Sequence, residues 1–174
     1  NNEIKTLLIK RMTCEFHECY GASEVGVVSN LAPQNSKNKI HTVGSAVPGV
    51  EIKITDEQKK PVAIGQIGEI TCKSNMCFSR YYMNETATKQ SITDGFFHTG
   101  DMGYLDEDGY LVFSGRKKEV IITGGTNVFP KDIESVLNEH SKIKESAVIG
   151  VEDKRFGEAI LALIISEKEE TLSS

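Results

Sequence analysis

Residues 114–134 read SGRKKEVIITGGTNVFPKDIE, and this stretch decides how the second half of the chain folds. It combines a basic cluster, an apolar run rich in β-branched residues, a glycine pair and a proline. Residues 119–123 predict a strand, and Gly124 and Gly125 predict the turn that ends it. Pro130 suits the first turn of a helix, where its missing amide donor is no loss.

The predicted helix carries one apolar stripe formed by Ile133, Val136 and Leu137. Two further strands are predicted after it, over residues 144–151 and 159–166. Residues 117–166 therefore describe a compact α+β unit.

Short strands dominate the chain before this unit. The apolar spacing over residues 3–12 predicts a helix, and residues 14–20 predict a strand. Asn84 can cap a short helix over residues 85–90, because its side chain accepts from free amides of the first turn. Residues 50–113 predict mostly short antiparallel strands, which would form a twisted sheet or a partial barrel.

Composition and charge exclude several classes of protein. The net charge of -5 gives no electrostatic reason to expect a nucleic-acid partner. No apolar run approaches the ~20 residues of a transmembrane segment. The four cysteines (Cys14, Cys19, Cys72 and Cys77) lack the tighter pairing of zinc motifs. We interpret them as reduced, partly buried thiols, which favours a cytoplasmic location.

Residues Tyr20-Gly21-Ala22-Ser23-Glu24 are the first candidate for nucleotide chemistry. Tyr20 offers a flat aromatic face beside a glycine, where another group can approach the backbone closely. The hydroxyl of Ser23 suits a phosphate, and the carboxylate of Glu24 suits a hard cation such as Mg²⁺. Taken alone, the same five residues also fit a turn at a strand end.

Thr99-Gly100-Asp101 is the second candidate, because a carboxylate fixed after a glycine can accept from two vicinal hydroxyls of a ribose. A capped hairpin turn is the simpler interpretation of these three residues. We interpret His98 as a packed side chain rather than a catalyst. Further along, Arg116 offers an always-charged donor fork for ribose or phosphate oxygens, or lies in a surface basic patch.

The three motifs together, in this order, resemble signatures of the adenylate-forming superfamily, to which the acyl-CoA synthetases belong. Residues 20–24 resemble its Tyr-Gly-x-Thr/Ser-Glu, and residues 94–101 resemble its Gly-(Trp/Phe)-Phe-x-Thr-Gly-Asp. Residues 114–134 resemble its domain junction. The match at residues 68–70 and 80–82 is weaker, because Tyr81 stands where the family has glycine, and we treat that region as structural.

The resemblance implies a role for each matching residue. Tyr20, beside Gly21, would stack on adenine; Ser23 would contact the α-phosphate and Glu24 would hold Mg²⁺, which makes Ser23 and Glu24 the catalytic candidates. Asp101 would bind the ribose.

The junction has implied roles too. Arg116 would contact the nucleotide, and Lys118 would be the hinge about which a small domain rotates. Gly124 and Gly125 would line the passage for the thiol of CoA, where a side chain would narrow the opening, although they also fit a plain hairpin turn.

The resemblance also implies a mixed α/β and α+β architecture. Residues 1–115 would be the end of a large AMP-binding domain with a distorted antiparallel β-barrel subdomain, and residues 116–174 the hinge and first part of a small α+β C-terminal lid. The family's phosphate loop and its late lysine do not occur in the sequence, so we expect a piece of a longer enzyme that is inactive alone.

The implied parent is an ATP-dependent acyl-CoA ligase. It would use ATP and Mg²⁺ to activate a small carboxylic acid and would transfer the acyl group to CoA. The sequence does not choose among a fatty, an aryl or another acid. Two alternatives stay open: an adenylation domain that loads a carrier protein, and a non-catalytic module that binds a nucleotide or a partner. A luciferase-like second step would use the same scaffold.

Overall fold

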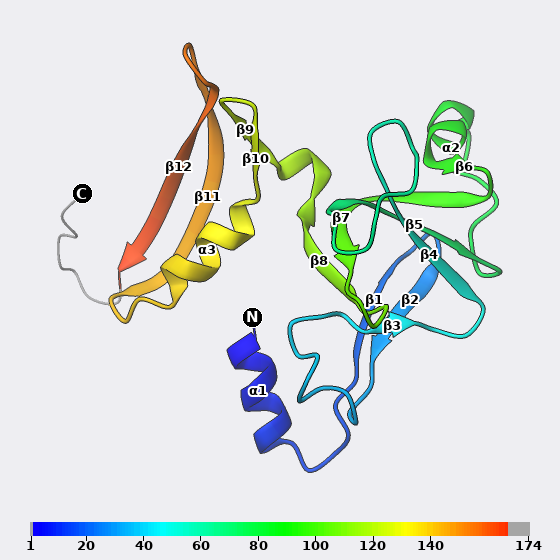
Figure 1. Ribbon diagram of the computed structural model, residues 1–174, viewed down its shortest axis with the longest axis horizontal. Helices are drawn as coiled ribbons and strands as arrows, with labels where there is room; N and C mark the ends of the chain where they lie inside the picture. The colour runs from blue at the N-terminus through cyan, green and yellow to red at the C-terminus, as the bar shows by residue number, and fades with distance from the viewer. Residues whose placement is uncertain (1, 167–174) are drawn as a thin grey trace. The chain divides into compact units, whose positions relative to one another are not determined.

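The computed structural model describes residues 2–166, without the side chain of Glu3. The chain divides into two compact units, one that ends at Phe113 and one that begins at Ser114 (Figure 1). Within the described residues no helix is long and apolar enough to cross a membrane.

The described part of the first unit contains two helices. They are α1 (Asn2–Arg11) and α2 (Glu85–Ser91). Its strands are β1 (Glu18–Ala22), β2 (Gly26–Leu31), β3 (Ser45–Ala46), β4 (Val50–Thr55), β5 (Gly68–Ser74), β6 (Ile92–Thr93), β7 (Phe96–Leu105) and β8 (Leu111–Arg116), the last of which runs past the unit boundary. Asn84 caps α2 as predicted, by accepting from the amide of Ala87 at 3.0 Å.

The strands of the first unit form two antiparallel sheets. The first has the order β1-β2-β3, and the second has the order β4-β5-β7-β6 with β8 also paired to β7. The antiparallel pattern expected for residues 50–113 is thus confirmed. The expected barrel is wrong in one respect, because neither sheet closes on itself among the described residues.

Apolar side chains from both sheets fill two small cores. The first core cluster contains Val25, Val28, Cys72 and Phe97. The second contains Ile54, Ile70 and Leu111. Because β5 and β7 supply residues to these cores, the loops at their ends are attached to a packed base.

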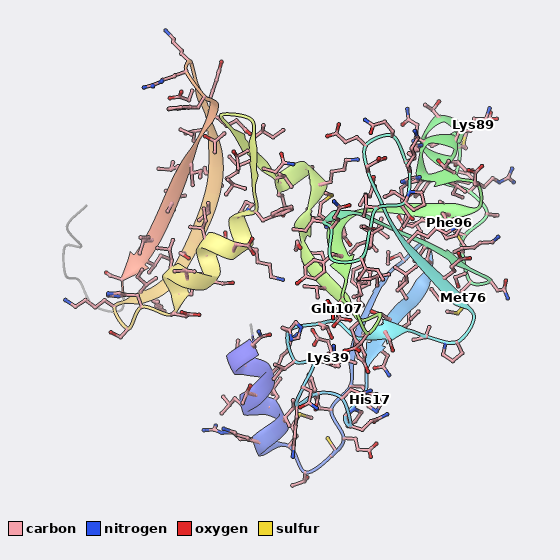
Figure 2. The ribbon with its side chains drawn as sticks, viewed as in Figure 1. His17, Lys39, Met76, Lys89, Phe96 and Glu107 are labelled. Carbon is pink, nitrogen blue, oxygen red and sulfur yellow. The ribbon has the colours of Figure 1, made fainter. Side chains whose placement is uncertain are left out.

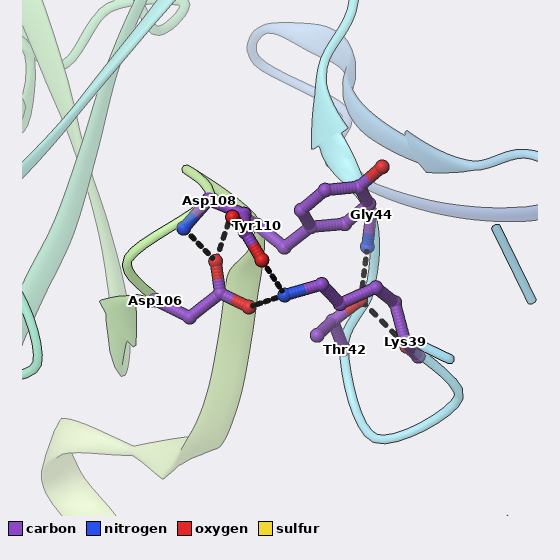
Figure 3. Close-up of polar contacts among 6 residues, drawn as sticks. All are labelled: Lys39, Thr42, Gly44, Asp106, Asp108 and Tyr110. Carbon is purple, nitrogen blue, oxygen red and sulfur yellow. Dashed lines mark hydrogen bonds and ion pairs between the residues drawn. The ribbon is translucent and has the colours of Figure 1, made fainter.

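Lys39 connects the loop before β3 to the turn between β7 and β8. Figure 2 labels Lys39 in the loop and Glu107 in the turn. Lys39 donates to Asp106 Oδ2 at 2.7 Å and to Asp108, and its ammonium lies 5.0 Å from the centre of the Tyr110 ring (Figure 3). These hydrogen bonds raise the pKa of Lys39 above its usual value, so the ammonium stays charged.

The second unit is an α+β unit, as expected for residues 117–166. Its elements are the 3₁₀ turn η1 (Lys117–Glu119), β9 (Ile121–Thr123), β10 (Thr126–Val128), α3 (Pro130–Asn138), β11 (Ile143–Asp153) and β12 (Gly157–Ser166). The sheet has the order β10-β9-β12-β11, and α3 lies along β11 (Figure 1).

The predicted stripe on α3 is partly wrong. Ile133 and Leu137 are half-buried, but Val136 is 69% exposed. The reason is that Glu134 accepts from the amide of Val148 on β11 at 2.8 Å. At about 100° per residue, this contact turns the sheet-facing side of α3 toward residues 133, 134 and 137 and away from 136.

The prediction of a strand over residues 14–20 is also only partly right. The strand β1 begins at Glu18 and continues through Gly21 and Ala22. Cys14 therefore precedes the strand, and both Cys14 and Cys19 are exposed rather than partly buried.

Candidate functional site

The first motif forms the tip of the β1–β2 hairpin. Tyr20 and Gly21 lie in β1, and Ser23 and Glu24 lie in the turn before β2. A Cβ atom on Gly21 would collide with the carbonyl oxygen of Gly26, so the crowding between the two strands is enough to require glycine here. The register of the hairpin shifts between Tyr20 and Gly21, which is typical of a bulge that re-aims a side chain.

The second motif forms a bulge in β7. Glu69 pairs with Met102 and Thr71 pairs with His98, so Ile70 of β5 faces the three residues 99–101 of β7. The Thr99 hydroxyl stabilises the bulge by donating to the Ile70 carbonyl at 2.7 Å. It also accepts from the Asp101 amide at 3.0 Å.

Glu69 holds the middle of the same bulge. Its Oε1 accepts from the Gly100 amide at 3.3 Å, and its Oε2 lies 3.6 Å from Nδ1 of His98. Gly100 has a φ of 71°, a left-handed conformation that favours glycine. The Thr99 hydroxyl, the Ile70 carbonyl and the Glu69 carboxylate thus fix the backbone that carries Asp101.

Tyr20 and Asp101 meet, although they are 81 residues apart in sequence. The Tyr20 hydroxyl donates to Asp101 Oδ2 at 2.7 Å and so joins the two sheets of the first unit. Burial raises the pKa of Tyr20 above its usual value, and the Asp101 carboxylate adds to the shift, so the hydroxyl remains a donor. The ring of Tyr20 is half-buried and tilted against Phe113, with ring centres 6.2 Å apart.

The carboxylate of Glu24 is held from a different part of the chain. The Tyr81 hydroxyl donates to Glu24 Oε1 at 2.8 Å. Burial, followed by this hydrogen bond, raises the pKa of Tyr81 above its usual value. Ser23 is exposed beside Glu24, so its hydroxyl is open to a ligand.

The donor set around Glu24 suits a hard divalent cation that a nucleotide also binds. Among residues 2–166 there is no group of three or more His, Cys, Asp and Glu side chains that could hold a metal ion by themselves. Mg²⁺ is commonly bound by one or two carboxylates together with substrate phosphates, rather than by a cage of protein ligands. A single oriented carboxylate next to a hydroxyl therefore fits Mg²⁺ that arrives with a nucleotide.

The junction residues belong to the second unit. Arg116 ends β8 and is exposed, and Lys118 lies in the exposed 3₁₀ turn η1. Gly124 and Gly125 form the two-residue turn between β9 and β10, with φ values of 56° and 82°. Positive φ at both positions is what a type I′ hairpin needs, so the turn by itself explains both glycines.

Sequence reasoning missed two functional candidates, Glu69 and Tyr81, because it treated their segments as structural. Glu69 lies in β5, where a carboxylate that is 9% exposed needs partners inside the fold. The sequence shows Glu69 as the one charged residue within residues 68–72, but the burial that makes partners necessary is seen only in the structure. The contact between Tyr81 and Glu24 spans 57 residues and has no local signal.

The structure therefore has a mixed α/β fold in which the first two nucleotide motifs adjoin. The model of the AMP-binding enzyme family matches residues 1–82, and the model of the AMP-binding enzyme C-terminal domain matches residues 132–174. The chain belongs to this family, the adenylate-forming enzymes.

Individual relatives agree with this assignment. The chain is 36% identical to a 2-succinylbenzoate–CoA ligase of Bacillus licheniformis, over 94% of this chain and 35% of the relative. It is 33% identical to a fatty acid–acyl-carrier-protein ligase of Streptomyces coeruleorubidus, over 89% of this chain and 31% of the relative.

A solved structure gives the same result. The o-succinylbenzoate CoA synthetase of Bacillus subtilis, in complex with its acyl-adenylate intermediate, superposes with a TM-score of 0.89 at 30% identity. The comparison covers 98% of this chain and 35% of that chain. The chain thus spans about a third of the length of the curated relatives that it matches.

Proposed function

We propose that this chain forms part of an ATP-dependent acyl-CoA ligase, which converts a carboxylic acid into an acyl-adenylate and then transfers the acyl group to CoA. The observation that carries the proposal is the hydrogen bond between Tyr20 and Asp101. This bond brings the aromatic ring that would stack on adenine next to the carboxylate that would accept from the ribose hydroxyls. The CoA ligases among the relatives support the reaction class.

The nucleotide would bind across the two sheets of the first unit. Adenine would stack on the ring of Tyr20, beside the backbone of Gly21. The ribose hydroxyls would donate to the carboxylate of Asp101, which the bulge in β7 holds in place. The Ser23 hydroxyl, which is exposed in the hairpin turn, would donate to the α-phosphate.

In the first half-reaction, an oxygen of the substrate carboxylate attacks the α-phosphorus and the bond to the β-phosphate oxygen breaks. The products are acyl-adenylate and pyrophosphate. Mg²⁺ would supply charge neutralisation on the phosphates when bound. Glu24 would hold that cation, and Ser23 and Arg116 would stabilise charge on the phosphate oxygens.

In the second half-reaction, the thiolate of CoA attacks the acyl carbonyl and AMP leaves. We assign residues 1–115 to the end of the large AMP-binding domain and residues 116–174 to the hinge and first part of the lid. Lys118 would be the hinge, since the single 3₁₀ turn around it is short and exposed. Gly124 and Gly125 would border the passage of the thiol.

A carrier protein is the second candidate acceptor in place of CoA. The observation that favours it is the relative named as a fatty acid–acyl-carrier-protein ligase, at 33% identity. Both acceptors present a thiol at the end of a flexible arm, so the residues described here serve either one.

The test uses the full-length protein that contains this chain and a panel of fatty and aryl carboxylic acids. Pyrophosphate exchange that depends on one of these acids would support adenylation. AMP release that then requires CoA would support the ligase, whereas release that requires a carrier protein would support the second candidate. An absence of exchange with every acid would contradict the proposal.

A further inference from the structure

Tyr81 reaches the proposed cation site from outside the motif that forms it. Its hydroxyl donates to Oε1 of Glu24 at 2.8 Å, and both side chains are half-buried. Because Tyr81 lies just before α2 and Glu24 lies at the tip of the β1–β2 hairpin, the bond ties together two separate elements.

The orientation of Tyr81 is set on two sides. Its backbone amide donates to the Thr88 hydroxyl of α2 at 3.0 Å, and that hydroxyl donates to the Asn84 carbonyl at 2.8 Å. Its ring packs edge-on against Phe78, with centres 4.6 Å apart. Phe78 in turn packs at 86° against the core residue Phe97. Tyr81 is thus anchored to a helix and to the core before it meets Glu24.

Glu24 is held at two points by the same short segment. The Phe78 amide donates to the Glu24 carbonyl at 2.6 Å, which fixes the backbone. The Tyr81 hydroxyl fixes one carboxylate oxygen. The other oxygen, Oε2, accepts no hydrogen bond from residues 2–166 and is left for a ligand.

We propose that Tyr81 is a positioning residue for Glu24, which holds Oε1 so that Oε2 binds the divalent cation of the nucleotide complex. The inference rests on the proposed function, since it takes Glu24 as a ligand of that cation. Hydrogen bonds to ligating carboxylates set their orientation, and their loss typically weakens metal binding about 10–100-fold.

The test compares two neighbouring tyrosines in the full-length protein. Tyr81→Phe removes the hydroxyl and keeps the ring that packs on Phe78. Tyr82→Phe is the matched control, because Tyr82 is 91% exposed. Binding of Mn²⁺ in the presence of a non-hydrolysable ATP analogue is followed by electron paramagnetic resonance, and the melting temperature is measured alongside.

We expect Tyr81→Phe to weaken Mn²⁺ binding about tenfold and Tyr82→Phe to leave it unchanged. The same loss should appear as a higher Mg²⁺ concentration for half-maximal pyrophosphate exchange, with a smaller change at saturating Mg²⁺. In a Glu24→Gln background, Tyr81→Phe should add nothing further, because its effect acts through the carboxylate.

The inference would be overturned if Tyr81→Phe binds Mn²⁺ as tightly as the wild-type protein does. This holds even if the variant has a lower melting temperature, because the hydrogen bond would then contribute only to stability. The proposed function would survive that result if the wild-type protein still shows acid-dependent exchange. A wild-type protein without exchange and without nucleotide-dependent Mn²⁺ binding would overturn both.

Discussion

The substitution Tyr20→Phe tests the contact between the two nucleotide motifs. The variant keeps the ring beside Phe113 and deletes only the hydroxyl that donates to Asp101 at 2.7 Å. Asp101 is only 6% exposed, so water cannot readily replace the lost donor. A hydrogen bond to a charged group contributes about 1.5–3 kcal/mol, and we expect the free energy of unfolding to fall by that amount.

The assay is urea unfolding of the full-length protein, in the transition that includes the first unit. Tyr82→Phe is again the control, because Tyr82 is 91% exposed. Removing its hydroxyl should change the free energy of unfolding by less than about 0.5 kcal/mol. Equal unfolding free energies for Tyr20→Phe and Tyr82→Phe would refute the reasoning.

A double-mutant cycle separates the pair from its surroundings. Combined with Asp101→Asn, Tyr20→Phe should cost less than it does alone, with a coupling energy of at least about 0.5 kcal/mol. Additive effects would mean that the two side chains do not interact in solution.

Three further predictions concern the hinge, the glycine turn and acid stability. In the full-length protein, Lys118→Pro should spare pyrophosphate exchange and impair thioester formation, since proline fixes φ where rotation is needed. Equal loss of both half-reactions would contradict the role of Lys118 as the hinge. Gly125→Val should destabilise the second unit by about 1–2 kcal/mol, because φ is 82° at this position. Gly125→Asn should destabilise it less in thermal unfolding, because Asn adopts positive φ more readily than Val. Equal destabilisation by the two variants would count against a conformational cause. Burial would raise the pKa of Asp106, but hydrogen bonds, first that from Lys39, outweigh it and hold the pKa below its usual value. The stabilisation from Asp106 is therefore present above about pH 4 and lost as pH falls through the folded-state pKa. Asp106→Asn should make the free energy of unfolding fall less steeply with decreasing pH in this range. A pH dependence equal to that of the wild-type protein would contradict the prediction.

Much of the fold follows from local patterns. The helix cap at Asn84 and the proline start of α3 need only neighbouring residues, and both occur as predicted. The strand β2 was not predicted, because Ser29 and Asn30 interrupt its apolar run. Ser29 is nevertheless fully buried, since its hydroxyl donates to the Val43 carbonyl at 2.7 Å. That partner lies in another segment, which the sequence of β2 does not reveal.

The candidate site divides in the same way. The chemistry of Tyr20, Glu24 and Asp101 can be read from residue types and from the resemblance to a known family. The contacts that orient them depend on the sheet register, such as the three-residue bulge that carries Asp101. The partner of Glu24 comes from a segment where Tyr81 departs from the family pattern, so local reasoning discarded it.

The most direct measurement is a crystal structure of the full-length protein with a non-hydrolysable acyl-adenylate analogue. Our account predicts the ribose hydroxyls within about 2.6–3.2 Å of the Asp101 carboxylate and adenine stacked on the ring of Tyr20. A nucleotide bound elsewhere, with Tyr20 and Asp101 still bonded to each other and touching no ligand, would contradict it.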